Sequence, residues 1–200
     1  MPESEFVLTV EGEQELRQKM DRLPARIRQR VGERALLTSA LLLEAHIKQN
    51  KLSGQALRVR SGRLRSSISH RLERAGEDLT AVVGTNVVYA RIHEFGGTVT
   101  PKRAAHLAIP TDIARTPAGV PRYTARQLVA NPGIGGFART FFRNHKLYGV
   151  TRSGRVRAAF VLVKSVTFRE RRYMRSALAE KRTDILRTIT TAVEEALRET

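Results

Sequence analysis

The sequence predicts a mixed α+β fold: a small, mostly antiparallel sheet with a long N-terminal helix, a C-terminal helix and an extended basic loop. Apolar residues recur at helical spacing toward both ends of the chain, and short β-rich runs separated by turn residues occupy the middle. A stretch at about 111–146 is rich in Pro, Gly and Arg. Because 200 residues suffice for one ordinary core, we expect a single domain over residues 1–200, with this stretch inserted as an arm.

The N-terminal region combines a β-rich run with helical periodicity. Apolar residues alternate over residues 5–10, which predicts a short strand. From residue 13 to about residue 47 apolar residues recur at steps of three and four, which predicts one long helix or a pair of helices. Pro24 has no backbone N–H, so it either kinks the long helix or opens a second one.

Short elements follow in the middle of the chain. Ser61 can cap a short helix that runs through Ile68. Residues 69–74 and 79–84 are β-rich and flank four residues with turn chemistry, which predicts a hairpin. A second short helix is expected at 87–95, and the two glycines after it favour a left-handed helix stop.

The arm and the C-terminal third complete the expected order. Pro and Gly are frequent between residues 111 and 146, which is typical of a loop. An apolar stripe that includes Leu178, Ile185 and Val193 predicts a long amphipathic helix. The other expected elements in this part are strand pieces at 98–100 and 106–109, a helical turn near 125–129, strands at 147–151 and 156–166, and the last helix at about 171–198.

The charge of the chain is strongly positive and unevenly distributed. Lys and Arg total 36 against 19 Asp and Glu, which gives a net charge of +17. Residues 51–175 hold 24 basic and six acidic side chains, whereas the segments on either side are close to neutral. Between residues 95 and 164 there are twelve Lys or Arg and the single acid Asp112. This stretch favours a polyanionic partner, and counterion release would drive its binding to nucleic acid.

Residue types and motifs that the sequence lacks exclude several kinds of chemistry. The chain has no cysteine, so disulfides, thiol catalysis and thiolate metal sites are absent. His93-Glu94 is similar to the start of a zinc-protease helix, but Gly97 stands where the second histidine is required. The glycine-rich run 131–136 lacks the Lys-Ser/Thr pair of a phosphate loop, and the isolated carboxylates do not form the cluster of a two-metal nuclease. We therefore expect no catalytic residues, no metal ion and no cofactor, and we expect that the protein is not an enzyme.

Motifs that recur in order connect the chain with a known family. They are the run 61–68, the run 83–97 with its Glu-Phe-Gly-Gly ending, the segment 101–110 and the start of the last helix at 172–174. On these motifs the chain resembles the tail-component and virion-morphogenesis proteins of tailed bacteriophages, Mu-like and lambda-like phages included. The last motif departs from the family, because it lacks the usual Arg-Pro-Phe. The family-motif residues, to which we assign scaffold roles, are Ser61, Gly62, Arg63, Leu64, Gly84, Tyr89, His93, Glu94, Gly96, Gly97 and Pro110.

The resemblance implies a structural protein of the virion neck, at the junction of head and tail. It implies a head-tail connector or tail-completion ring through which DNA passes, built of copies of this chain with sixfold or twelvefold symmetry. The expected partners are further copies, other neck, portal-adaptor and tail proteins, and packaged DNA in nonspecific contact, with no membrane. Assembly is expected in the cytoplasm of the bacterial host. The candidate interface or DNA-channel residues are Arg115, Arg122, Arg126, Arg139 and Arg143.

Two alternatives come from other functional classes. A basic nucleic-acid-binding protein that acts in solution would explain the net charge of +17 without any assembly. A nuclease would also bind nucleic acid, but it needs clustered acids that the sequence lacks. Tight, salt-dependent DNA binding by the isolated protein would favour the first alternative over a ring subunit.

Overall fold

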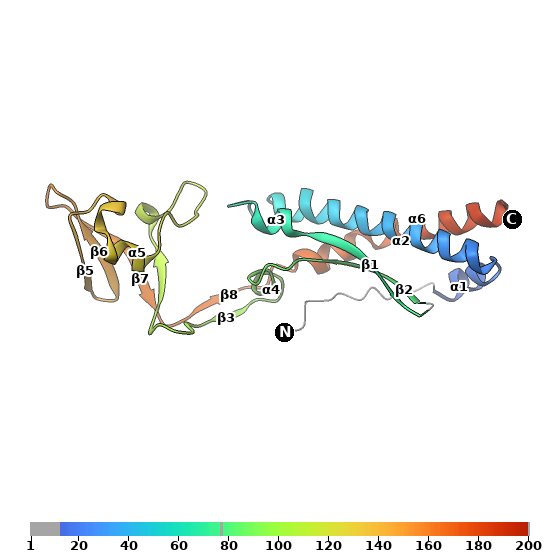
Figure 1. Cartoon of the computed structure of the whole chain (residues 1–200), viewed down its shortest axis with the longest axis horizontal. Helices are drawn as coiled ribbons and strands as arrows, with labels where there is room; N and C mark the ends of the chain where they lie inside the picture. Colours follow the sequence, from blue (N-terminus) through green and yellow to red (C-terminus); the bar gives the residue numbers. More distant parts are fainter. Residues whose placement is uncertain (1–12, 77, 200) are drawn as a thin grey trace. The chain divides into compact units, whose positions relative to one another are not determined.

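The chain folds as two compact units (Figure 1). The computed structural model describes residues 13–76 and 78–199. The first unit, which we call the helical unit, comprises Met1–Phe95 and Arg171–Thr200, and the second, the β unit, comprises Gly96–Glu170. The mixed α+β class is confirmed, whereas two units replace the single domain that the sequence predicted.

The helical unit contains both long helices. The second helix starts directly after Pro24, which has a φ of −54°. Proline suits the start of a helix, because its φ is close to the helical value and no backbone N–H is needed there. The N-terminal pattern therefore corresponds to a pair of helices. The strand expected at 5–10 lies outside the described residues. The elements of this unit are α1 (Glu13–Asp21), α2 (Ala25–Gln49), the 3-10 turn η1 (Lys51–Ser53), α3 (Arg63–Ser67), β1 (Ser69–Ala75), β2 (Asp78–Gly84), α4 (Ala90–Phe95) and α6 (Tyr173–Arg198).

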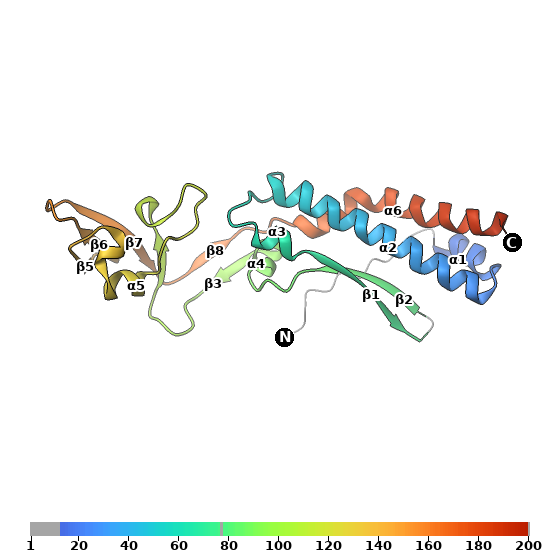
Figure 2. The same cartoon turned by 45° about the horizontal axis from the view of Figure 1, so that its top comes forward.

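The two long helices of this unit, α2 and α6, lie side by side and run in opposite directions (Figures 1 and 2). Near the end of α2, Ile47 belongs to a core cluster that includes Met174 from the start of α6. Just before α2, Leu23 packs against Val193 from the end of α6. The antiparallel hairpin of β1 and β2 packs against α2. The helical unit therefore has a helix pair as its frame and a hairpin on one of the two helices.

The β unit is built on a four-stranded antiparallel sheet. The strand order is β4-β7-β6-β5, and β3 pairs with β8 in a separate short ribbon. A core of Tyr123, Leu128, Phe137, Leu147 and Phe160 lies on one face of the sheet. The elements are β3 (Gly97–Val99), β4 (Leu107–Pro110), η2 (Asp112–Ala114), α5 (Ala125–Ala130), η3 (Pro132–Gly135), β5 (Arg139–Arg143), β6 (Lys146–Val150), β7 (Val156–Val163) and β8 (Val166–Phe168).

The structure corrects the extended arm expected at 111–146, because that stretch is part of the folded β unit and holds η2, α5, η3 and β5. α5 begins with a capping box, in which the side chains of Thr124 and Gln127 each accept a hydrogen bond from the other residue's backbone N–H. The ring of Phe137 covers Gly149 and leaves no room there for a Cβ. The Pro and Gly residues of this stretch therefore form turns around a packed core.

Candidate functional site

The buried carboxylate of Glu94, at the end of α4, is the centre of the family motif. Glu94 is 1% exposed. Its Oε2 accepts a hydrogen bond from the backbone N–H of Met174 at 2.8 Å, and its Oε1 accepts one from the N–H of Arg175 at 3.1 Å. Both donors belong to the first turn of α6, where the helix dipole favours a negative charge. Glu94 therefore caps a helix that lies about 80 residues further along the chain.

Arg175 completes this cap from the other side. Its Nε donates to Glu94 Oε1 at 3.0 Å, and its Nη2 donates to the backbone oxygen of Glu94 at 3.2 Å. The guanidinium carbon also lies 4.8 Å from the centre of the Phe95 ring, within the range of a cation–π contact. The Glu-Phe pair of the motif thus holds one arginine by its charge and by an aromatic face.

The two glycines of the motif occupy backbone conformations that other residues rarely adopt. Gly96 has a φ of +69° and Gly97 a φ of +126°, which confirms the predicted left-handed stop after the helix. A Cβ on Gly96 would lie 2.8 Å from the backbone nitrogen of Glu170 and 2.9 Å from the carbonyl oxygen of Phe168. Gly96 is therefore required both by its conformation and by the close approach of another backbone segment.

Burial shifts the pKa values of two side chains near α4, His93 and Tyr173. Burial lowers the pKa of His93, and the positive charges of Arg171 and Arg60 lower it further, which favours the neutral imidazole. Tyr89 contacts His93 edge-on, with ring centres 6.1 Å apart. Burial also raises the pKa of the Tyr173 hydroxyl, which keeps it protonated. The backbone oxygen of His93 accepts a hydrogen bond from the N–H of Arg171 at 2.8 Å, just before the start of α6.

The remaining motif residues are spread over both units. Gly62, with a φ of +74°, occupies the N-cap position of α3. Ser61, one residue earlier, accepts a hydrogen bond at its Oγ from the N–H of Arg63, the first residue of the helix, at 3.4 Å. Leu64 packs against the core at the α2–α6 contact, while Arg63 is exposed. Gly84 ends β2. Pro110 belongs to the β unit, where it pairs with Phe160 at the end of β4.

All five candidate interface arginines belong to the β unit, but they do not form one cluster. Arg139 and Arg143 lie four residues apart on β5, so their side chains face the same side of the sheet. Arg126 lies exposed on α5, whose Leu128 packs in the core on the opposite face. Nε of Arg122 donates to the backbone oxygen of Arg115 at 2.9 Å. The sequence therefore grouped residues that the fold divides between two faces.

The face that carries Arg139 and Arg143 also carries residues that the sequence did not single out as a site. Phe141 stacks on Tyr148 of β6, with ring centres 5.3 Å apart and planes 13° apart. Lys146 pairs with Arg143 and therefore faces the same side. The signal for this arrangement was available, because the register of a hairpin over residues 139–150 brings these side chains together.

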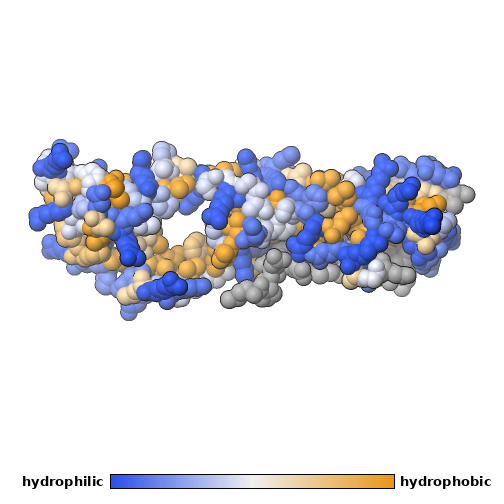
Figure 3. All heavy atoms as spheres, in the orientation of Figure 1, coloured by the Kyte–Doolittle hydropathy of each residue, from blue (hydrophilic) through white to orange (hydrophobic). Residues whose placement is uncertain are grey.

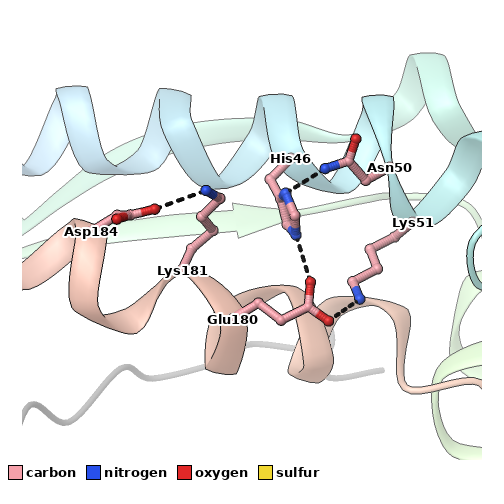
Figure 4. Close-up of polar contacts among 6 residues, drawn as sticks. All are labelled: His46, Asn50, Lys51, Glu180, Lys181 and Asp184. Carbon is pink, nitrogen blue, oxygen red and sulfur yellow. Dashed lines mark hydrogen bonds and ion pairs between the residues drawn. The ribbon is translucent and has the colours of Figure 1, made fainter.

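A polar network joins the two long helices of the helical unit (Figure 4). Nδ2 of Asn50 donates to Nδ1 of His46 at 2.8 Å, which leaves His46 Nε2–H to donate to Glu180 at 2.9 Å. The carboxylate of Glu180 also pairs with the buried ammonium group of Lys51. These hydrogen bonds lower the pKa of Glu180, that from Lys51 most strongly. The network fastens α6 to the end of α2, and nothing in the sequence spacing indicated it.

Hydrophilic residues cover much of the visible face, with hydrophobic residues between them on both units (Figure 3). Residues 13–76 and 78–199 contain no group of three His, Asp or Glu placed to hold a metal ion. Among the same residues no helix is long and apolar enough to cross a membrane. Val88, just before α4, is 95% exposed.

Comparison with known proteins identifies one family. The sequence model of the phage virion morphogenesis family matches residues 40–139. This range covers the Glu-Phe-Gly-Gly motif, the hairpin of the helical unit and the β unit as far as the first residue of β5. No curated protein and no solved structure matches the chain.

Proposed function

The chain belongs to the phage virion morphogenesis family and so acts in building a bacteriophage virion, and on this premise we propose that it is a structural subunit of the neck. In this proposal, copies of the chain form a head-tail connector or tail-completion ring through which DNA passes. The neck is the place where an oligomeric protein of this kind meets both packaged DNA and other virion proteins.

The difference in net charge between the two units is the main observation that supports the proposal. The β unit holds 13 Lys or Arg against two acids, Asp112 and Glu170. The helical unit holds 23 Lys or Arg against 17 Asp or Glu, so it is much closer to neutral. The positive side chains of so small a unit repel one another when the protein is isolated. A polyanion or an acidic protein surface beside the unit offsets this repulsion, so its binding is favoured. A ring around DNA supplies such surroundings.

The motif supports a structural and non-catalytic role. The carboxylate of Glu94, which is the one acid among the family-motif residues, already accepts hydrogen bonds from two backbone amides and from Arg175. A group satisfied in this way fixes a helix end and offers no base or nucleophile to a substrate. We therefore propose that the protein has no enzymatic activity.

The proposed partners follow from the exposed groups of the β unit. A ring uses heterologous interfaces, in which one face of a subunit complements a different face of the next. Arg139, Arg143 and Lys146 beside the Phe141–Tyr148 stack form a face suited to an acidic neighbour: a further copy, or a portal-adaptor or tail protein. Packaged DNA would be contacted without sequence preference.

A DNA titration beside an assembly assay tests the proposal against the solution binder. The titration of the isolated protein with duplex DNA is carried out at two salt concentrations. A ring subunit should bind weakly and nonspecifically at both. Replacing Arg115, Arg122, Arg126, Arg139 and Arg143 by Gln together should strongly reduce head-tail joining. The matched control replaces five exposed arginines of the helical unit, Arg22, Arg26, Arg30, Arg34 and Arg198, and should affect joining less.

Nanomolar, sequence-selective binding near physiological salt, with joining unaffected by the first set of substitutions, would contradict the neck proposal and favour a nucleic-acid-binding protein that acts in solution.

A further inference from the structure

One end of the helical unit is strongly basic. The loop and short helix that follow α2, the turn before α4 with α4 itself, and the start of α6 lie together there (Figures 1 and 2). Their segments, 51–68, 85–95 and 171–179, hold nine Lys or Arg and one acid, the buried Glu94. The rest of the helical unit holds 16 acids and 14 bases. Positive charge is therefore concentrated at this end, which we call the basic end.

Side chains from three of these segments meet on the surface of the basic end. Arg60 and Arg171 are exposed, and both lie close enough to His93 for their charges to lower its pKa. The backbone N–H of Arg171 also donates to the backbone oxygen of His93 at 2.8 Å. Tyr89 contacts the same imidazole edge-on and is 40% exposed. The two arginines and the tyrosine thus surround one histidine.

Apolar side chains are exposed beside these groups. Val88 precedes Tyr89 in the chain and is 95% exposed, and Val59 precedes Arg60 and is 43% exposed. Single exposed hydrophobic residues are ordinary, whereas apolar residues that adjoin a charged and aromatic surface are typical of a place where another molecule binds. The basic end therefore combines charge with apolar contact area.

A fixed turn presents Val88 to solvent. Its neighbour Val87 is buried, and the N–H of Val87 donates to Thr85 Oγ1 at 3.2 Å. The backbone oxygen of Val87 accepts a hydrogen bond from the N–H of Ala90 at 2.9 Å. Because the backbone on either side of Val88 is held in this way, little conformational entropy is lost when the side chain becomes covered.

We propose that the basic end docks an acidic segment of another virion protein, which covers Val88 and Tyr89 and pairs its carboxylates with the two arginines. This surface belongs to the helical unit and differs from the face of the β unit considered above. The proposal rests on the role of the family in building a virion, and it holds for any position of the protein in the particle.

The apolar residues favour a protein partner over DNA. Arg, Lys, hydroxyl and amide groups make the contacts to phosphates and sugars, and an aliphatic side chain adds nothing to them. Arginine and aromatic residues around an apolar centre are instead enriched at protein interfaces. Carboxylates suit the guanidinium groups of Arg60 and Arg171, with which they form charge-assisted hydrogen bonds. An acidic segment with apolar side chains meets both requirements.

A second copy of this chain matches the basic end less well. Many acids of the helical unit already pair with bases of the same chain, so their charge is partly neutralised. These acids include Glu15, Asp21, Glu33, Glu73, Asp184 and Glu194. The β unit holds only two acids. The complementary charge is therefore expected from a different protein.

Site-specific cross-linking of the full-length protein in infected cells identifies the occupant. The photoreactive residue p-benzoyl-phenylalanine replaces Val88, and Leu41, which is 49% exposed on α2, is the matched control position. We expect position 88 to cross-link to a different phage protein, on a peptide whose acids outnumber its bases, with about tenfold the yield of position 41. A cross-link to DNA, to a second copy or to a basic peptide, or a yield equal to that of the control, would overturn the proposal.

The cross-link is separable from the neck proposal. Cross-linking in cells reports the partner wherever the protein resides, whereas its position in purified particles is measured independently. An acidic partner peptide on a protein from another part of the particle would support the docking surface and contradict the neck.

Substitutions test whether the contact matters for assembly, in a phage that lacks the gene and receives each variant in trans. Val88→Asp repels an acidic segment and should lower the yield of infectious particles about tenfold or more, as should Arg60→Gln together with Arg171→Gln. Leu41→Asp is the control and should stay within about twofold of the parent. Both aspartate variants replace exposed side chains, so their melting temperatures should lie within about 2 °C of the parent. Equal particle yields for Val88→Asp and Leu41→Asp would overturn the proposal.

Discussion

The cap formed by Glu94 offers the sharpest test of the scaffold role of the motif. Glu94→Ala removes an acceptor that is 1% exposed and leaves the backbone N–H groups of Met174 and Arg175 without it. A hydrogen bond to a charged group contributes about 1.5–3 kcal/mol, and loss of a helix cap costs about 0.5–2 kcal/mol. The side chain of Arg175 is 39% exposed, so water partly replaces its partner and the ion pair adds little.

The expected cost of Glu94→Ala is therefore about 4 kcal/mol of unfolding free energy, and that of Glu94→Gln, which keeps one oxygen acceptor, is about 2 kcal/mol. Urea denaturation followed by far-UV circular dichroism measures both, because α2 and α6 dominate the helical signal. With a slope of about 2 kcal/mol per molar urea, the midpoints should fall by about 2 M and 1 M.

The matched control is Glu195→Ala on the exposed side of α6, which should change the unfolding free energy by less than about 0.5 kcal/mol. If Glu94→Ala and Glu94→Gln behave like this control, the buried cap does not hold the start of α6 and the reasoning about the motif is wrong.

Three further predictions concern single residues. Gly96→Val should lower the unfolding free energy by about 2 kcal/mol or more, whereas Gly32→Ala, inside α2 with an ordinary φ, should raise it by about 0.5–1 kcal/mol; thermal melts of both distinguish these outcomes. Gly149→Ala should destabilise the β unit because its Cβ meets the Phe137 ring, and proton chemical shifts of that ring should move; an unchanged spectrum would contradict this packing. Since the pKa of Glu180 is lowered in the folded protein, its contribution is present above the unfolded value of about 4.3 and is lost as pH falls through the folded value. Glu180→Gln should therefore reduce the loss of stability between pH 6 and pH 3, measured as urea midpoints, and an unaltered pH dependence would refute the role of the network.

Local signals in the sequence predicted most of the secondary structure. Pro24 marks the start of α2, the turn residues after β1 produce the hairpin, and Gly96 and Gly97 stop α4 as expected. Each of these features depends on backbone conformations that single residues restrict or permit. The α4 helix itself begins three residues later than predicted, at Ala90.

The β unit shows where local signals fail. Tyr123, Leu128 and Phe137 are spaced irregularly among Pro and Gly, so no helical or strand period connects them, and their common core with Leu147 and Phe160 exists only in the folded unit. A stretch with this composition is typical of a loop unless distant strands supply apolar partners.

The sequence singled out Glu94 within a motif but did not indicate which groups its carboxylate contacts. The motif pointed to Glu94, but Arg175, its partner, lies 81 positions away and carries no spacing signal. Likewise the five candidate arginines share a charge and a segment, and the sheet then divides them between its two faces. Long-range pairing of this kind depends on the topology, which a single sequence does not display.

The position of the protein in purified virions tests the central claim most directly. Electron microscopy of particles labelled with an antibody against the purified protein, together with the mass of the complex released from them, locates the protein and counts its copies. We predict label at the head-tail junction and a closed complex of six or twelve copies. Label elsewhere on the particle, or a protein that is absent from purified virions and present only in the lysate, would contradict the neck proposal.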